Sequence, residues 1–375
     1  MSVPQRVRVV GAGLLGTSIA LALRVRGVDV TLTDTSPVSA ALAADMGGGR
    51  LASDDDAAPD VVVVAAPPDV TADVIAAELE RWPEATVTDV ASVKNAVVVA
   101  VRELAGADAA ARYVPGHPMA GRERSGAVAA RSDLFEGRTW VVCPDGAEAE
   151  RVRDVISLAE SVGARVVTMA PEEHDTAVAA VSHVPQLAAS LVAAQLRELS
   201  EPAVGLSGQG VRDVTRIAAS DPLLWTQILA GNARAVRPVV DRFIEELTAV
   251  RDALRAVEQP DSPAAGDGLG PGPRAVLAGT IAAGQDGQAR IPGKHGTPPT
   301  TYATVAVVVP DEPGALGRLF VVVGESGVSV EDLRLEHDAS VAAGLLEIDV
   351  LPVRAEVLRE ALAAKGWSVH VLETH

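Results

Sequence analysis

The chain has 375 residues, of which 48% are hydrophobic, and carries a formal net charge of −18. This length suffices for two or three domains with their own cores, whereas the charge disfavours nucleic acid and anionic membrane surfaces as partners. No apolar run approaches the roughly 20 residues that span a bilayer, no signal-peptide pattern opens the chain, and the single cysteine, Cys143, excludes an internal disulfide and disfavours a metal cluster. We therefore expect a cytoplasmic protein without a metal site.

The first 34 residues carry the pattern of a dinucleotide-binding unit. A β-branched strand over 7–10 leads into a turn with three glycines, a helix over 17–26, and a second strand over 28–34 that ends in an acid. The glycines supply a tight turn, a bare backbone for a pyrophosphate and close helix packing, while the acid accepts from both ribose hydroxyls and repels a 2′-phosphate. The sequence thus favours NAD over NADP. The residues expected to bind it are Gly11, Gly13, Leu14, Leu15, Gly16, Asp34, Pro67 and Ser92.

Strands alternate with helices up to residue 168, which predicts a parallel α/β sheet. Further strands are expected over 60–66, 86–90, 113–115, 139–143 and 165–168, with a helix over 70–79 between the first two of them. Ligands of such sheets lie outside the carboxyl ends of the strands, so Pro67 and Ser92 are candidates for the nicotinamide end. The alternative is that both are ordinary loop residues and that Ser92 caps the following helix.

His117 is the candidate proton acceptor. It stands between Gly116 and Pro118, directly after an expected strand, so its backbone is held by its neighbours rather than by a helix. Histidine is the side chain best suited to take a proton near neutral pH. A lone histidine is also often structural, and spacing alone leaves both interpretations open.

From Pro171 onward the apolar spacing becomes helical, with a kink expected at Pro185 in a helix over 172–199. On an unbroken helix His174 and His183 would lie on opposite faces and could not form a metal pair, whereas His183 and Gln186 would share a face.

Two arginines follow in a short helical stretch. Arg212 and Arg216 are four residues apart and therefore adjacent, which suits a ligand with carboxylates. The alternative is a surface ion pair between Asp213 and Arg216. Residues 220–222 then form a helix start with a capping side chain and a proline. The helix expected beyond them, through Trp225 to Val257, is apolar enough to pack on a partner subunit.

The remainder is a proline- and glycine-rich linker followed by a small separate unit. The linker includes an ordered-looking segment over 274–283 and a specific hexapeptide over 291–296 for which we have no physical account. The last unit has the order βαββαβ. Its strands are expected over 304–309, 328–335, 345–350 and 367–372, and its helices over 315–325 and 354–364.

Several motifs along the whole chain resemble the prephenate dehydrogenase family, the TyrA-type enzymes of tyrosine biosynthesis. These motifs are the glycine turn over 11–16, the segment 89–94, the segment 117–121 with Glu123, and the segments 181–185, 213–218 and 220–225. The C-terminal unit resembles an ACT domain, a regulatory module that often binds amino acids, through its first turn over 311–316.

The resemblance implies a Rossmann-type nucleotide domain over 1–168, an all-helical substrate and dimerisation domain over 169–258, a linker over 259–300 and a ferredoxin-like ACT domain over 301–375. It implies NAD-dependent oxidative decarboxylation of prephenate to 4-hydroxyphenylpyruvate, a homodimer, and tyrosine as an effector at the ACT domain. His117 would accept the proton of the ring hydroxyl, Ser92 would orient that hydroxyl, and Arg216 would pair with a carboxylate of the substrate. The pocket would be completed by Glu123, Arg212, His183, Gln186 and Trp225.

One departure from the family concerns the substrate's side chain. Many relatives carry a second histidine where this chain has Gln186, and an amide can hydrogen-bond but carries no charge. The choice between prephenate and arogenate therefore stays open, with prephenate favoured. Two other classes remain as alternatives, namely a β-hydroxyacid-type dehydrogenase and an amino-acid sensor with an inactive nucleotide domain. The former would place a catalytic lysine or aspartate in the helical domain, where this chain has arginines.

Overall fold

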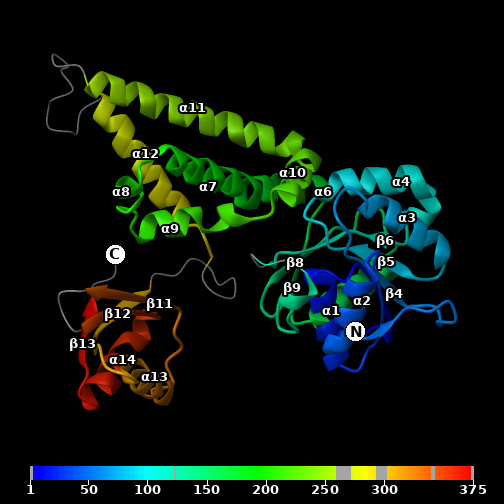
Figure 1. Cartoon of the computed structure of the whole chain (residues 1–375), viewed down its shortest axis with the longest axis horizontal. Helices are drawn as coiled ribbons and strands as arrows, with labels where there is room; N and C mark the ends of the chain where they lie inside the picture. The colour runs from blue at the N-terminus through cyan, green and yellow to red at the C-terminus, as the bar shows by residue number, and fades with distance from the viewer. Residues whose placement is uncertain are drawn as a thin grey trace. The chain divides into compact units, whose positions relative to one another are not determined.

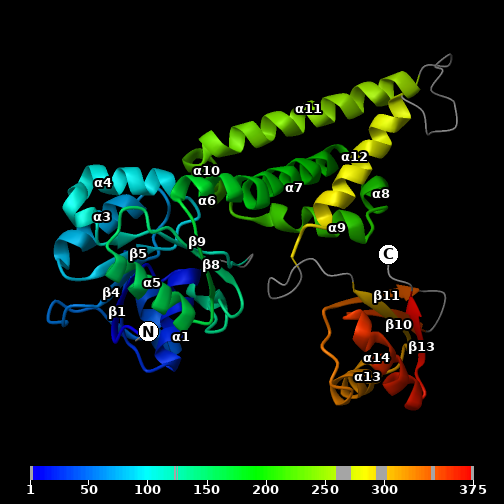
Figure 2. The ribbon, with the colours of Figure 1, turned by 180° about the vertical axis from the view of Figure 1, so that it is seen from behind.

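The computed structural model describes residues 3–121, 124, 126–258, 272–292, 302–338 and 343–372. The chain forms two compact units, Met1–Thr248 and Ala249–His375, each described by itself. Figure 1 shows the first unit in blue to green and the βαββαβ part of the second in orange to red, and Figure 2 shows both from behind.

The first unit opens with a six-stranded parallel sheet in the order β3-β2-β1-β4-β5-β6. This is the strand order of doubly wound dinucleotide-binding folds. Strands β2 and β3 are added on one side of β1 and the later strands on the other, so the order of addition switches between β1 and β4. The predicted parallel sheet is therefore confirmed. Its strands are β1 (Arg6–Val10), β2 (Asp29–Thr33), β3 (Arg50–Leu51), β4 (Val61–Val64), β5 (Thr86–Asp89) and β6 (Tyr113–Val114).

Helices cover both faces of this sheet, which explains why β4 consists of four valines. Val61 and Val63 belong to one core together with residues of α1 and α5, whereas Val62 and Val64 belong to a second core with residues of α3 and α4. A strand buried on both faces has no polar side to alternate with. The helices of this part are α1 (Leu14–Val25), α2 (Pro37–Ala43) with a π turn (Ala44–Gly48), α3 (Thr71–Arg81), α4 (Asn95–Ala110) and α5 (Ala149–Ser161).

The last predicted strands do not extend the parallel sheet. They form a separate three-stranded sheet in the order β7-β8-β9, in which β7 (Gly116–Pro118) is antiparallel to β8 (Thr139–Val142) and β8 is parallel to β9 (Arg165–Thr168). His117 consequently lies within a short strand and pairs with Val141, where the sequence predicted a loop position. A 3-10 turn (Ala127–Ala129) lies between β7 and β8.

The middle of the chain is helical, as predicted, but its helices are more broken than expected. The stretch predicted over 172–199 is interrupted by a π turn just before Pro185, which occupies the first turn of the next helix and lacks an N–H group. The helix predicted through Trp225 to Val257 is interrupted at Asn232. The elements are α6 (Pro171–Val178), π turn Ala179–His183, α7 (Val184–Gln195), 3-10 turn Leu196–Glu198, α8 (Glu201–Val204), α9 (Gln209–Thr215), 3-10 turn Arg216–Ala219, α10 (Pro222–Gly231) and α11 (Ala233–Val257).

One helical stretch of the described residues, Pro171–Glu198, is long and apolar enough to cross a membrane by length and composition. The statement that no apolar run approaches this length is therefore wrong. The core helix of a soluble protein passes the same test, and a third of the relevant window is buried inside the structure.

The second unit contains α12 (Pro273–Gln288) and the βαββαβ fold, whose element order is confirmed. Its sheet is antiparallel in the order β11-β12-β10-β13, and one face packs on helices through Val305, Ile348, Leu319 and Leu358. Part of the predicted linker is thus helical, and the second strand begins at Asp332 rather than at residue 328. The elements are β10 (Ala303–Pro310), α13 (Ala315–Glu325), β11 (Asp332–Asp338), β12 (Ala343–Val350), α14 (Pro352–Ala364) and β13 (Ser368–Leu372).

Candidate active site

The three glycines of the first turn have three different environments. Gly11 has a φ of +106°, and a Cβ on it would lie 2.3 Å from the carbonyl oxygen of Ala65. A Cβ on Gly16 would lie 1.9 Å from the carbonyl oxygen of Gly11, whereas a Cβ on Gly13 would meet no atom within 4 Å. The first glycine therefore makes the turn, the third allows helix and strand to touch, and the second leaves open space where a phosphate can approach the backbone.

The acid at the end of β2 is fixed beside this turn. The carboxylate of Asp34 accepts hydrogen bonds from the backbone N–H of Ala12 (2.6 Å) and of Ser36 (2.7 Å). Gly13 is the N-cap of α1 and has no side chain to satisfy the first N–H groups of that helix, so they can bind an anion. Leu14 and Leu15 follow, half-buried, at the start of the same helix. The turn, the helix start and the acid fit a dinucleotide.

The loops after β4 and β5 lie at the same carboxyl edge of the sheet. Pro67 is exposed in the first of these loops, and Ser92 is half-buried in the second. Ser92 is not the cap of α4. The cap is provided by the carboxylate of Asp175, which accepts from the backbone N–H of Lys94 (2.8 Å) and of Asn95 (2.9 Å). The alternative role for Ser92 as a helix cap is therefore wrong.

A buried ion pair fixes the loop that carries Ser92. Lys94 and Asp89 are both fully buried and bonded to each other, and the ammonium of Lys94 also donates to the carbonyl oxygen of Gly116 (2.6 Å). The carboxylate of Asp89 further accepts from the Tyr113 hydroxyl (2.8 Å) and from the backbone N–H of Ala91 (2.9 Å). Each hydrogen bond that a buried charge makes offsets part of the free energy that the charge loses on leaving water. The cluster ties the loop after β5 to the residue that precedes His117.

His117 is 9% exposed and lies against a second histidine. Its Nδ1 is 2.8 Å from Nε2 of His174, and the Nδ1 of His174 is 2.8 Å from a carboxylate oxygen of Asp175. The two rings meet edge to face, with centroids 5.1 Å apart. Burial, followed by the charges of His174, Lys94 and His183, holds the pKa of His117 well below its usual value. At neutral pH the imidazole is therefore uncharged and can accept a proton.

His183 occupies the end of the π turn and is 1% exposed. Its Nδ1 is 3.1 Å from the side-chain nitrogen of Asn232, which also donates to the backbone carbonyl of Asp175 (2.8 Å). Burial lowers the pKa of His183 to about 4, so the neutral ring accepts at Nδ1 and carries its proton on Nε2. That Nε2 has no hydrogen-bond partner among the described residues. The indole of Trp225 lies edge to face against the same ring, at 6.0 Å between centroids.

Gln186 is 5% exposed and bonds to the segment that carries the second arginine. Its amide donates to the backbone carbonyl of Ile217 (3.0 Å), and its oxygen lies 3.4 Å from the Ser220 hydroxyl. Arg212 ends up exposed on α9, and Arg216 is exposed as the first residue of the following 3-10 turn. The predicted helix start after this turn is confirmed, with the Asp221 carboxylate accepting from Leu223 N–H (2.8 Å).

Cysteine and metal chemistry find no support in the described part of the chain. Cys143 is buried, and burial raises the pKa of its thiol to about 12, so it is not a reactive thiolate. No group of three or more histidine, cysteine or acidic side chains among the described residues could hold a metal ion.

Known proteins match the chain along nearly its whole length. Residues 19–168 match the family model described as the prephenate dehydrogenase nucleotide-binding domain, and residues 170–263 match the one described as its dimerization domain. A probable prephenate dehydrogenase of Streptomyces niveus is 38% identical over 364 residues, which are 96% of this chain and 98% of that protein. The chain belongs to the prephenate dehydrogenase family.

Two further relatives support this membership. The prephenate dehydrogenase of Bacillus subtilis is 28% identical over 354 residues, 90% of each chain. The crystal structure of the Aquifex aeolicus prephenate dehydrogenase in complex with hydroxyphenyl propionate and NAD+ is 29% identical, with a TM-score of 0.64, and the match covers 77% of this chain and 98% of that one.

Part of the predicted pocket lies outside the described residues, and the prediction missed other residues of the site. Glu123 lies outside the described residues, as does most of the hexapeptide that begins at Ile291. The prediction from the sequence also missed Asp175 and Asn232, and it considered His174 only as a possible metal ligand, which it rejected. Their signal was weak because each acts through a partner more than 45 residues away. The prediction that His174 and His183 lie on opposite faces assumed an unbroken helix, and the π turn Ala179–His183 interrupts that helix.

Proposed function

We propose that the chain catalyses the NAD-dependent oxidative decarboxylation of prephenate. Family membership supports the reaction. The single observation that supports its assignment to particular residues is the uncharged His117. This residue is buried beside the carboxyl edge of a sheet whose glycine turn and Asp34 fit a dinucleotide. The Aquifex structure, which contains NAD+ and a hydroxyphenyl acid by its description, supports the same pairing of cofactor and substrate class.

In this proposal each residue has a chemical task. His117 accepts the proton of the ring hydroxyl as the hydride leaves the carbon that bears it, and Ser92 orients that hydroxyl. Bound NAD supplies the hydride acceptor. The ring carboxylate is lost as CO2, and aromatisation drives this step. Arg216 pairs with a substrate carboxylate and fixes the ring. Arg212, His183 and Trp225 complete the pocket, with Glu123 and Gln186.

Steady-state formation of reduced cofactor tests the proposal. Prephenate and arogenate are each assayed with NAD and with NADP, and turnover of prephenate with NAD is expected. Replacing the base in His117→Asn should lower kcat by about 10²–10⁴-fold, while binding of NAD to the glycine turn is retained. A clear preference for arogenate would keep the chemistry and change the substrate. No turnover of either compound would refute the proposal.

The contacts of Gln186 bear on the choice between prephenate and arogenate. The amide nitrogen of Gln186 donates to the carbonyl of Ile217 (3.0 Å), and the hydroxyl of Ser220, which lies 3.4 Å from the amide oxygen, donates at 2.6 Å to that same carbonyl. An amide that is engaged in this way holds the turn and contributes little to the choice between a keto acid and an amino acid. Its replacement of the relatives' histidine is then compatible with either substrate, and the Arg216 side of the pocket decides.

We also propose that the helical region forms a homodimer. The family model matched by residues 170–263 is described as a dimerization domain, and α11 exposes apolar side chains at helical spacing, including Phe243, Ile244 and Leu247. Exposed apolar stripes of this kind are covered in the assembled state. Light scattering should give twice the mass of the chain, and a monomeric mass at micromolar concentration would refute the dimer.

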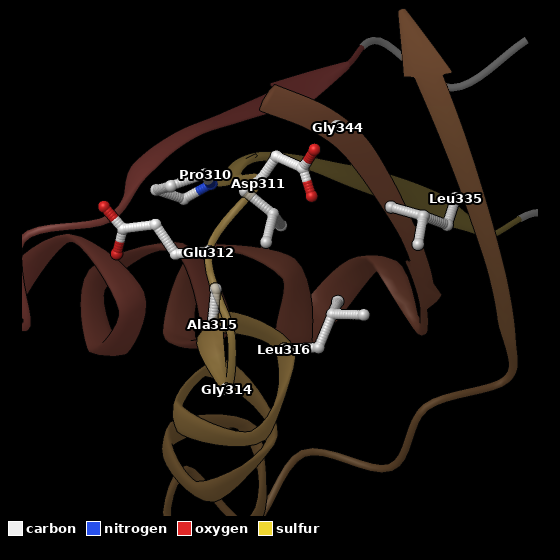
Figure 3. A pocket seen from close by; sticks show the side chains of 9 residues that line it. Pro310, Asp311, Glu312, Gly314, Ala315, Leu316, Leu335 and Gly344 are labelled. Atoms are coloured by element: carbon white, nitrogen blue, oxygen red, sulfur yellow. The ribbon is translucent and has the colours of Figure 1, made fainter. Parts of the chain in front are cut away.

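For the C-terminal unit we propose an ACT-type regulatory role with tyrosine as the effector. The turn between β10 and α13 borders a small cavity of about 170 Å³, which is also lined by Leu335 of the edge strand β11 (Figure 3). Gly314, with a φ of +82°, precedes α13 in this turn. The cavity is lined by Val309, Pro310, Asp311, Glu312, Gly314, Ala315, Leu316, Leu335 and Gly344.

Two variants test the effector. Leu335→Trp fills the cavity in the full chain and should weaken inhibition by tyrosine at least about tenfold, a change of about 1.4 kcal/mol in binding free energy. A chain ending at Val257 should keep its turnover and lose the inhibition. Unchanged inhibition in both would refute the regulatory role. We also propose that the domains of the chain meet at residues 168, 258 and 300 and that the protein is cytoplasmic.

A further inference from the structure

The proton acceptor is the end of a row of three side chains. Asp175 accepts hydrogen bonds from the backbone N–H groups of Lys94 and Asn95 at the start of α4, and it lies 2.8 Å from Nδ1 of His174. The opposite nitrogen of that ring, Nε2, lies 2.8 Å from Nδ1 of His117. His174 is fully buried and Asp175 is 5% exposed, so no bulk water competes for these contacts.

The row determines where each proton sits. An ionised carboxylate only accepts hydrogen bonds, so the Nδ1 of His174 must carry the proton that Asp175 accepts. In a neutral ring the other nitrogen then has a lone pair, and it can only accept. The Nδ1 of His117 must therefore donate to it. The second nitrogen of His117, Nε2, is left without a proton and with its lone pair free.

We propose that His174, held by Asp175, is a positioning residue that keeps His117 in the tautomer whose Nε2 can take the proton of the substrate. The inference deepens the proposed function, on which its kinetic part rests. Without His174, a neutral His117 can place its proton on either nitrogen, and the tautomer with the proton on Nε2 cannot act as a base. Analogous loss of the correct tautomer in the Ser-His-Asp triad costs about 10⁴-fold in kcat.

The surroundings of His117 favour a neutral pair of rings over a protonated one. The charged or titratable groups that act on it are Lys94, His174 and His183, and each lowers its pKa, as does burial. Asp175 is the acid of the row, and its charge is shared between His174 and the two N–H groups at the start of α4. A proton added to His117 would therefore lie in a buried site near the ammonium of Lys94, and Asp175 does not contact His117 directly.

The test compares two substitutions of the positioning residue. His174→Phe keeps the volume of an aromatic ring but accepts no hydrogen bond, and we expect kcat to fall by about 10²-fold or more with KM for NAD unchanged. His174→Gln retains an acceptor oxygen for the N–H of His117, and we expect kcat to recover to within about tenfold of the wild type. His370→Phe, an exposed histidine of the second unit, is the control and should change neither value.

Nitrogen NMR of histidine-labelled enzyme reads the tautomer without any substrate. In the wild type we expect the proton of His117 on Nδ1, in His174→Gln the same tautomer, and in His174→Phe a shift of the population toward Nε2. The low-pH limb of kcat/KM should move to higher pH in His174→Gln, because the pKa of His117 is then no longer lowered by its interaction with a second titratable ring. Packing alone would move neither signal.

The outcomes separate this inference from the proposed reaction. A wild-type enzyme with the His117 proton on Nε2, or a His174→Phe variant that keeps its tautomer and its kcat, would overturn the inference. If His174→Phe fails to fold, as judged by thermal unfolding and NADH binding, the wild-type spectrum and His174→Gln decide. Enzyme that shows the expected tautomer but does not oxidise prephenate would refute the substrate and leave the inference standing.

Discussion

The buried His183 makes the stability of the first unit depend on pH. Its pKa is lowered to about 4 in the folded chain, chiefly by burial, from an ordinary 6.5. The unfolded chain therefore binds a proton once the pH falls below its ordinary pKa, while the folded chain does not do so until about 4. Stability is complete above the ordinary pKa and is lost as the pH falls toward the folded one.

The variant His183→Gln removes this proton and keeps an acceptor for Asn232. Between about pH 7.5 and 4.5 the wild type should lose about 1–2 kcal/mol more than the variant, after allowance for solvent screening of the charge. For a unit of this size that amounts to about 3–6 °C in Tm.

Scanning calorimetry of the full chain measures the difference. The transition of the first unit is identified by its shift to higher temperature when NAD is added. Carboxylates and His117 titrate in both proteins, so their contribution cancels in the comparison. If the wild type and His183→Gln lose Tm in parallel as the pH falls, the unprotonated state of His183 is wrong.

Three further predictions concern other parts of the site. Gly13→Ala should leave Tm within about 2 °C but weaken NADH binding at least about tenfold in a fluorescence titration, whereas Gly16→Ala, whose Cβ meets backbone at 1.9 Å, should lower Tm as well. Gln186→Leu removes the hydrogen bond that ties α7 to the carbonyl of Ile217 in the 3-10 turn, so KM for prephenate should rise about 2–10-fold with a smaller change in kcat. Lys94→Met leaves Asp89 buried without its cation, and thermal unfolding should show a loss of about 3–5 kcal/mol.

The sequence predicted the parts of this protein that depend on local patterns. The glycine turn and Asp34 could be placed because each element of that unit needs a particular residue type at a particular spacing, and the environments of Gly11, Gly13 and Gly16 differ in the way the turn requires. The valines over 61–64 indicated a strand by their residue type, and burial of this strand on both faces explains why it has no polar side.

The parts that the sequence missed depend on partners far along the chain. Nothing near Ser92 indicates that an acid 80 residues later caps α4, and serine is a favoured cap residue. The opposite faces predicted for His174 and His183 rested on a regular helical period, which the π turn Ala179–His183 changes. Helical spacing predicts which residues are buried and cannot predict what lies across from them.

The cap on α4 has a consequence for how this enzyme can be taken apart. Asp175 belongs to the part that matches the dimerization domain, yet it caps a helix of the nucleotide-binding part and, through His174, supports the imidazole of His117 in that part. The two halves are therefore not interchangeable modules. A chimaera that joins residues 1–168 to the helical half of a distant homologue would keep its affinity for the dinucleotide and lose turnover, unless the donor supplies an acid and an acceptor at the same two positions.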